Sequence, residues 1–327
     1  MPFEAQAVQL AKDPEHPSEN QDAYAFDLER GIAAVADGVS SAIFSGVWAE
    51  TLVQAVAWQP PDPDDAALFA DWLAQCRRRW SEQIDTTGLA WFQKAKLPTG
   101  AFSTLLWAQL LPLEPTHAGS FGGFRLLARA IGDSCLFHVR HGELLRCFPM
   151  TSAAEFETNP LALGSVDLGR DALMKFATLD VVCYPDDHLL LTTDAVAEWL
   201  YRRVESQNPP DWSTLWRTGQ SEWVDEINSL RVQREMRYDD ATVLTLRVTS
   251  QMQPEQPVLH DEAQAAEARA PTYDATAEEP LDATVEDATS PTQAALHQIA
   301  DGFNQLADES LRAGRTLLGR LRDRFRR

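Results

Sequence analysis

Apolar residues recur in short runs along the first 250 residues of the chain. The runs are rich in valine, isoleucine and leucine, and they span 31–39, 101–111, 124–133, 134–139, 187–194 and 242–248. Runs of this length predict buried strands, and the His-Gly pair at 141–142 predicts the turn of a hairpin. Because strands dominate, the pattern predicts a strand-rich α/β domain with helices packed outside the sheets.

Helical patterns occupy three stretches of the same region. The first extends from Ser45 to Trp58. The second begins near Asp64 and Asp65, which are favoured at helix N-caps, and continues through ALFADWLAQCRRRWSEQI. The third follows Asp194, in AVAEWLYRRV.

The pattern changes after Val248. Residues 251–290 hold ten acids and one arginine, and Tyr273 is their only aromatic residue. Such a segment buries too little apolar surface to offset the entropy of ordering, so we predict a disordered linker at 251–291 after a domain at 1–250. Apolar residues return at helical spacing in 292–327, which predicts a C-terminal amphipathic helix.

The end of this tail is strongly basic, because residues 312–327 contain seven arginines and one acid. Basic amphipathic helices are typical of elements that dock on an anionic membrane surface or on an acidic protein. Two alternatives stay open: the helix folds back on the acidic domain, or the basic end is disordered and has no role.

Composition narrows the classes of function. The net charge of −21 argues against nucleic-acid binding, because phosphates repel an acidic surface. The four cysteines form no CxxC pair, which disfavours a zinc site or a disulfide framework. The N-terminal sequence has no basic region followed by an apolar run, and no stretch is long enough to span a bilayer. We therefore expect a cytoplasmic protein, peripheral to the membrane if the tail docks there.

Acidic residues stand at the ends of predicted strands or in the turns beside them. The residues concerned are Asp22, Asp37 with Gly38, Asp133, Asp194, and Asp239 with Asp240. Each alone is typical of an ordinary turn. Together they favour a site for hard divalent cations, which prefer oxygen ligands.

The set and its order resemble the type 2C, or PPM-type, metal-dependent Ser/Thr protein phosphatases of bacteria. The family's motifs appear here as Asn20-Gln21-Asp22-Ala23, Ala36-Asp37-Gly38, Gly132-Asp133-Ser134, Thr193-Asp194-Ala195 and Asp239-Asp240-Ala241-Thr242. The stretch 99–104 is similar to the family's small-residue strand entry, and the resemblance covers residues 3–248. It implies an α/β (α+β) fold, a four-layer αββα sandwich in which helices flank two central antiparallel β-sheets.

The resemblance also implies a centre of two Mn²⁺ or Mg²⁺ ions, or three, and a metal-bridging water as nucleophile in place of a side chain. Asp37 would bridge two metals, the Gly38 carbonyl would hold one, and Asp194 and Asp239 would hold the other. Asp22 would act through a bound water, and Asp133 would help to bind a third ion.

The chain departs from the family pattern at several positions. Gln21 stands for a glutamate, Asp240 for an asparagine, and Val39-Ser40-Ser41 for Met-Gly-Gly. The arginine that many members use to hold phosphate is missing. His16 or Lys12 are the candidate phosphate contacts, and a loop histidine without a role is the alternative for His16.

Three functions follow from these observations. The first is a phosphatase acting on phosphoserine and phosphothreonine in proteins, opposing a Ser/Thr protein kinase system. The second is a pseudophosphatase, a binding module that keeps the fold without efficient turnover. The third is a scaffold whose tail determines where the domain is recruited.

Two further segments carry expectations. The stretch 151–167 matches the family's variable flap beside the active site, and an ordinary connecting loop is the alternative. The aromatic residues Trp72, Trp80, Trp91 and Phe92 are interpreted as core packing.

Overall fold

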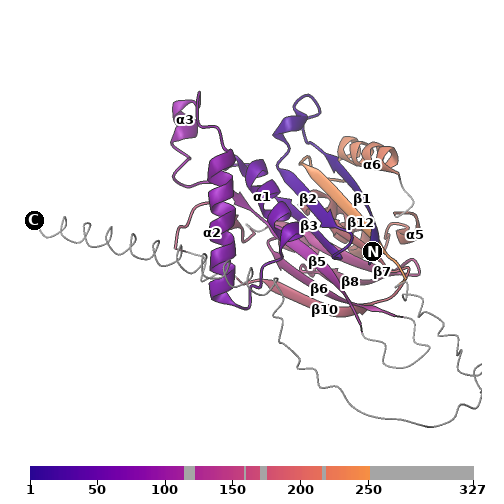
Figure 1. Ribbon diagram of the computed structural model, residues 1–327. Helices are drawn as coiled ribbons and strands as arrows, with labels where there is room; N and C mark the ends of the chain where they lie inside the picture. Colours follow the sequence, from indigo (N-terminus) through magenta and orange to yellow (C-terminus); the bar gives the residue numbers. More distant parts are fainter. Residues whose placement is uncertain (114–121, 158–159, 170–174, 216–218, 251–327) are drawn as a thin grey trace, which may run out of the picture. The chain divides into compact units, whose positions relative to one another are not determined.

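A computed structural model describes residues 1–113, 122–157, 160–169, 175–215 and 219–250 of the chain (Figure 1). All described residues lie in one compact unit, Met1–Gln256. The predicted linker at 251–291 and the predicted helix at 292–327 lie outside the described residues. The domain boundary near residue 250 stays a prediction.

Two five-stranded antiparallel sheets form the centre of this unit. The first has the order β1-β12-β11-β7-β8, with strands Phe3–Leu10, Ala241–Val248, His188–Thr192, Cys135–Arg140 and Glu143–Phe148. The second has the order β10-β6-β5-β3-β2, with strands Ala177–Cys183, Phe124–Ile131, Leu105–Pro112, Ile32–Asp37 and Asp22–Asp27. A short pair joins β4 (Phe102–Ser103) to β9 (Leu163–Gly164).

The central strands bury both of their faces. In β3, Ala33 and Val35 pack in the core between the two sheets, whereas Ile32 and Ala34 pack in a second core beneath helices. This double burial explains why the strands are continuous apolar runs without alternating polar residues. The cores on the two outer faces are covered by different helices, so the predicted four-layer αββα sandwich is confirmed.

Helices α1 (Ser45–Trp58) and α2 (Ala66–Gln83) cover the second sheet. Asp65 caps α2 as predicted, because its carboxylate accepts hydrogen bonds from the backbone N–H groups of Ala67 and Leu68, both at 3.0 Å. The predicted helix after Asp194 is α4 (Asp194–Glu205). It packs on the first sheet with α5 (Trp212–Leu215) and α6 (Gln220–Gln233).

The remaining elements are short. Helix α3 comprises Trp91–Lys94, and 3₁₀ turns span Pro17–Glu19 and Ala153–Glu157. The predicted hairpin turn at 141–142 joins β7 to β8, and both of its residues have positive φ (52° and 78°). That geometry matches the twist of the flanking strands.

The prediction of aromatic core packing is wrong for two residues. Trp80 is 4% exposed, but Trp91 and Phe92 are 82% and 55% exposed. These neighbours lie on the four-residue helix α3, where their rings contact each other edge to face with centroids 6.0 Å apart. Adjacent positions on a helix point in different directions, so a single short turn cannot bury both rings against one core.

No helix in the described part of the chain is both long enough and apolar enough to cross a membrane.

Candidate metal centre

The acidic residues of the motifs gather where strands of the two sheets end. Asp22 begins β2 and pairs in register with Asp37, the last residue of β3. Asp194 opens α4 directly after β11, and Asp133 lies in the connection from β6 in one sheet to β7 in the other. The chain therefore brings carboxylates from both sheets to one place, although they are far apart in sequence.

Three of these carboxylates form a tight group. Oxygens of Asp37, Asp133 and Asp194 all lie within 4.8 Å of one another. Thr104 links the segments that carry two of these carboxylates: its hydroxyl accepts from the Asp37 backbone N–H at 3.1 Å and bonds the hydroxyl of Ser134, the neighbour of Asp133, at 2.9 Å. Its own backbone N–H donates to the Asp37 carbonyl at 2.9 Å. These contacts hold the segments of Asp37 and Asp133 next to each other.

Asp22 lies against this group as a fourth carboxylate, 5% exposed. Its Oδ2 accepts hydrogen bonds from the hydroxyls of Thr193 at 2.7 Å and Thr242 at 2.9 Å. Its Oδ1 is buried without a hydrogen-bond partner among the described residues, and so is Oδ1 of Asp133. Buried carboxylate oxygens without donors are costly unless a cation meets them, so this donor set fits a divalent metal ion.

The electrostatics of the group lead to the same conclusion. Burial raises the pKa of Asp37 well above its usual value, and the nearby charges of Asp22 and Asp194 raise it further. Burial also raises the pKa of Asp194 to about 7, against the lowering effect of Arg237. Without a metal, protons must neutralise part of the cluster. A bound divalent cation would replace those protons.

Gly38 follows the first of these aspartates and has no room for a side chain. A Cβ at this position would lie 2.7 Å from the backbone of Ser45 and 2.8 Å from the Gln21 carbonyl oxygen. The Gly38 N–H donates to that carbonyl at 3.0 Å. The glycine therefore lets the loop after β3 approach the Gln21 backbone, and the ligand role of its carbonyl stays a prediction.

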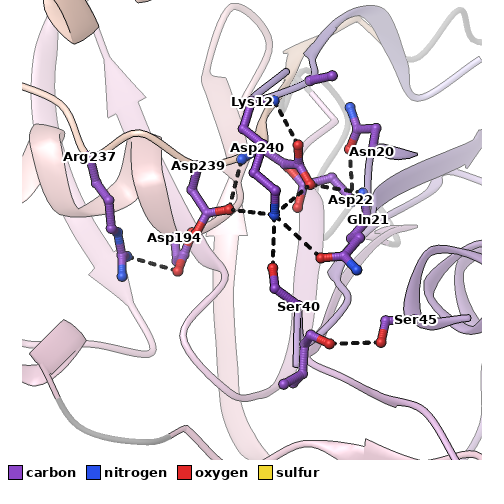
Figure 2. A network of polar contacts seen from close by, with 12 residues as sticks. Lys12, Asn20, Gln21, Asp22, Ser40, Ser45, Asp194, Arg237, Asp239 and Asp240 are labelled. Carbon is purple, nitrogen blue, oxygen red and sulfur yellow. Dashed lines mark hydrogen bonds and ion pairs between the residues drawn. The ribbon is translucent and has the colours of Figure 1, made fainter. Parts of the chain in front are cut away.

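Asp239 lies outside the group of three and faces Lys12 (Figure 2). The Lys12 ammonium is 2.9 Å from the Ser40 hydroxyl, 3.4 Å from Asp239 Oδ1 and 3.5 Å from Gln21 Oε1. Lys12 was proposed from the sequence as a phosphate contact, and the structure brings it to the centre. Its distance to Asp240 Oδ2 is 3.8 Å.

His16, the other candidate phosphate contact, is held elsewhere. Its Nδ1 lies 2.8 Å from Asp13 Oδ2, and its side chain is 59% exposed. The hydrogen bond that its ring donates to Asp13 raises the pKa of His16. No hydrogen bond or ion pair in the described ranges joins His16 to the aspartates of the motifs, which leaves Lys12 as the better placed of the two.

Sequence reasoning missed Arg237. Its Nη2 donates to Asp194 Oδ2 at 2.8 Å, and its Nε lies 3.3 Å from Glu198 Oε2, so a positive charge stands beside the group of three. The available signal was an arginine two positions before Asp239. The roles of the hydroxyls of Thr193, which precedes Asp194, and Thr242, two positions after Asp240, were also missed.

A second set of potential ligands lies elsewhere in the same unit. Ligand atoms of His138, Cys183 and Asp187 lie within 4.8 Å of one another and are buried. Asp187 is already satisfied: Arg140 donates from Nε and Nη2 at 2.7 Å each, His138 Nε2 lies at 2.8 Å, and the Tyr184 N–H donates at 2.9 Å. We interpret this set as a structural ion pair.

Comparisons with known proteins find similarity in structure alone. No protein-family model and no curated protein sequence matches the chain. The serine/threonine phosphatase PstP/Ppp of Mycobacterium tuberculosis is 17% identical, with a TM-score of 0.47 over 76% of this chain and 99% of that chain. PppA, a regulatory component of the T6SS in Pseudomonas aeruginosa, is 18% identical, with a TM-score of 0.47 over 76% and 98% of the two chains.

A third similar structure is the PPM Ser-Thr phosphatase MsPP of Mycobacterium smegmatis in complex with cacodylate. It is 19% identical, with a TM-score of 0.42 over 75% of this chain and 98% of that chain. The family named from the motifs thus appears again among the similar structures. At these identities and TM-scores no residue's role follows from the similarity, and the roles below depend on the geometry of the site.

Proposed function

We propose that this chain is a phosphoprotein phosphatase that depends on divalent cations and hydrolyses phosphoserine and phosphothreonine. The observation that carries the proposal is the convergence of Asp37, Asp133 and Asp194 within 4.8 Å, together with buried oxygens of Asp22 and Asp133 for which the described residues offer no donor. Two Mn²⁺ or Mg²⁺ ions, or three, are the proposed cofactors. When bound, such ions supply positive charge at the phosphoryl oxygens and lower the pKa of water.

The side chains around the centre have separate proposed roles. Asp37, Asp133 and Asp194 would hold cations, and Asp22 would support them through its free Oδ1. The Lys12 ammonium is the proposed contact for a phosphate oxygen, because it is a partly exposed cation that already faces the centre. Arg237 keeps the Asp194 carboxylate in place through the 2.8 Å hydrogen bond.

The proposed reaction needs no covalent intermediate with the protein. An oxygen of water bonds to phosphorus and the bond from phosphorus to the ester oxygen breaks. One proton of the water passes to the released serine or threonine oxygen, and the other stays on the phosphate. The products are inorganic phosphate and the free hydroxyl side chain. The substrates would be phosphorylated proteins, products of a Ser/Thr protein kinase.

A pseudophosphatase is the second candidate, and two observations favour it. Gln21 stands where some members of the family have a glutamate ligand, and Lys12 already faces Asp239. A binding module would retain phosphopeptide affinity without turnover.

Metal-dependent hydrolysis distinguishes the two candidates. We expect the full-length protein to hydrolyse p-nitrophenyl phosphate and a phosphothreonine peptide with Mn²⁺ or Mg²⁺, and to lose both activities in excess EDTA. Peptide binding without phosphate release at any metal concentration would support the pseudophosphatase instead.

Recruitment by the tail stays a separate prediction. Docking of 292–327 on an anionic membrane surface should weaken as salt rises, because screening shortens the range of charge attraction. Liposome co-sedimentation of the full chain and of a chain ending at Pro291 tests it. Equal binding by the two chains would leave docking on an acidic protein as the remaining version.

A further inference from the structure

Lys12 occupies an unusual place for a lysine. Its side chain is 32% exposed, yet its ammonium faces oxygens from three separate segments of the chain. Ser40 lies in the loop after β3, Gln21 directly precedes β2, and Asp239 lies in the loop before β12. A lysine on an open surface would point into water, so this ammonium serves the acidic centre.

Asp240 fixes the backbone from which this side chain extends. It is 3% exposed, and its two oxygens accept from the backbone N–H groups of Lys12 at 2.7 Å and Gln21 at 2.9 Å. An asparagine, which the family has here, offers a single oxygen and could accept only one of these bonds comfortably. The aspartate is therefore matched to holding Lys12 and Gln21 side by side.

Arg231 of α6 reinforces the same arrangement. Its guanidinium donates to the carbonyls of Leu10 and Ala11 at the end of β1 and to the carbonyl of Asp239. The segment that carries Lys12 and the loop that carries Asp239 are thus tied to one helix. Lys12 and Asp239 meet because their backbones are held together.

Two different cations could bind the Asp239 carboxylate: a metal ion or the Lys12 ammonium. Its motif makes it a candidate metal ligand, yet it lies outside the tight group of Asp37, Asp133 and Asp194 and faces the Lys12 ammonium at 3.4 Å. A divalent cation on the same carboxylate would stand a few ångströms from that ammonium, and their repulsion is strong at such a distance. Each cation would therefore weaken the hold of the other on Asp239.

We propose that Lys12 is a displaceable counter-ion, which neutralises Asp239 until a divalent cation binds there and then turns to the phosphate of the substrate. The flexible four-carbon stem and compact ammonium of lysine suit such a change, whereas the planar guanidinium of Arg237 is held between Asp194 and Glu198. The proposal has two halves. The metal half, that a cation displaces Lys12 from Asp239, does not depend on phosphatase activity. The phosphate half, that Lys12 then contacts the substrate, rests on the proposed function.

The metal half is tested by calorimetric titration of metal-free full-length protein with Mn²⁺. We expect Lys12→Met to tighten the weakest Mn²⁺ site by about tenfold, because a competing positive charge is gone. Lys12→Arg keeps the charge and should bind Mn²⁺ like the wild type. Lys96→Met is the matched control, since the Lys96 ammonium donates to the Ser41 carbonyl in the same loop and has no described contact with the aspartates.

The phosphate half is tested by titrating the Mn²⁺-saturated proteins with inorganic phosphate. Lys12→Met should bind phosphate about tenfold more weakly than the wild type and Lys96→Met, as expected for loss of one charge-assisted contact. Circular dichroism melting of each variant confirms that folded proteins are being compared. If Lys12→Met does not fold, Lys12→Gln serves in its place.

The outcomes separate this proposal from the proposed function. Unchanged Mn²⁺ affinity in folded Lys12→Met would overturn the displacement proposal, even if the wild type hydrolyses phosphopeptides. Tighter Mn²⁺ binding together with unchanged phosphate affinity would overturn the second half. Tighter Mn²⁺ binding in a protein without phosphatase activity would support the displacement while the proposed function fails.

Discussion

Buried carboxylates at two places in this sandwich, at Asp187 and around Asp37, differ in what satisfies them. At Asp187 the protein supplies the donors itself, from Arg140, His138 and a backbone N–H. Burial alone would raise the pKa of Asp187, but these hydrogen bonds together lower it to about 2. At Asp22 and Asp133, by contrast, one carboxylate oxygen of each has no donor in the described part of the chain.

The contrast shows how a carboxylate that stabilises the fold can be distinguished from one that binds a metal ion: by the hydrogen-bond donors around it. A carboxylate that stabilises the fold is surrounded by fixed donors, and its charged form is favoured. The Asp37 group has too few positive charges, and burial and mutual repulsion raise the pKa values of its members. The fold keeps these acids together at a cost in stability, which a bound cation would offset.

The largest expected effect is on catalysis at the Asp37 group. Asp37→Asn removes a proposed ligand and should lower turnover of a phosphothreonine peptide by about a thousandfold or more, the range expected when a main electrostatic contribution is lost. The fold should survive with equal or greater stability, because repulsion among the carboxylates is relieved. Wild-type turnover in a folded Asp37→Asn variant would remove this residue from the reaction.

At Asp187 we expect the opposite: a loss of stability without a loss of turnover. Asp187→Asn leaves the Arg140 guanidinium with a weakened partner and should lower the free energy of unfolding by about 3 kcal/mol. Turnover per folded molecule should be unchanged. Urea unfolding measures the loss, and Asp186→Asn, which changes a neighbouring side chain that is 74% exposed, is the control. Equal stability of the two variants would mean that Asp187 is not a structural anchor.

Metal binding should distinguish the clusters by stability as well. Mn²⁺ at about a hundred times its dissociation constant should raise the free energy of unfolding of the wild type by about 2.7 kcal/mol. Asp37→Asn should lose most of this gain, whereas Asp187→Asn should keep it. Thermal melts with and without Mn²⁺ give the comparison, and a gain that depends on Asp187 would reverse our assignment of the two groups.

The smallest effect is a difference in pH dependence. The raised pKa of Asp194, about 7, means that the metal-free folded state holds a proton which the unfolded state releases near pH 4. Stability therefore falls as pH rises from about 4 to 7, and Asp194→Asn should flatten this slope. The depressed pKa of Asp187 acts oppositely: its contribution is complete above about pH 4 and is lost as pH falls toward 2. Parallel slopes for wild type and Asp194→Asn between pH 4 and 7 would contradict the raised pKa.

Much of the site could be predicted because most of its aspartates stand in short motifs at the ends of apolar strands. Asp22, Asp37, Asp133 and Asp194 stand at strand ends or in adjoining turns, and a sheet brings such positions together. The strands that end beside Asp37, Asp133 and Asp194, and the helix after Asp194, were predicted from apolar runs, whereas β2, which begins at Asp22, was not. Lys12 was proposed for its charge, and the structure brings it to the centre.

The parts that were not predicted depend on partners distant in sequence. His138 and Asp187 are 49 positions apart and share no motif, so their pairing follows only from the register of β7 and β11. Arg237 belongs to no family motif that the sequence suggested. Helix α6 was overlooked because it is largely polar and buries mainly Trp223, Ile227 and Leu230, spaced by four and three positions.

The central claim is that the Asp37 group, and not the Asp187 group, binds divalent cations. The most direct measurement is a crystal structure of the protein soaked in Mn²⁺, with the ions located by their anomalous scattering. We predict anomalous peaks in contact with the carboxylates of Asp37, Asp133 and Asp194, and none at His138, Cys183 and Asp187. Peaks confined to the second set, or no peak at Asp37 with Mn²⁺ at millimolar concentration, would contradict the account.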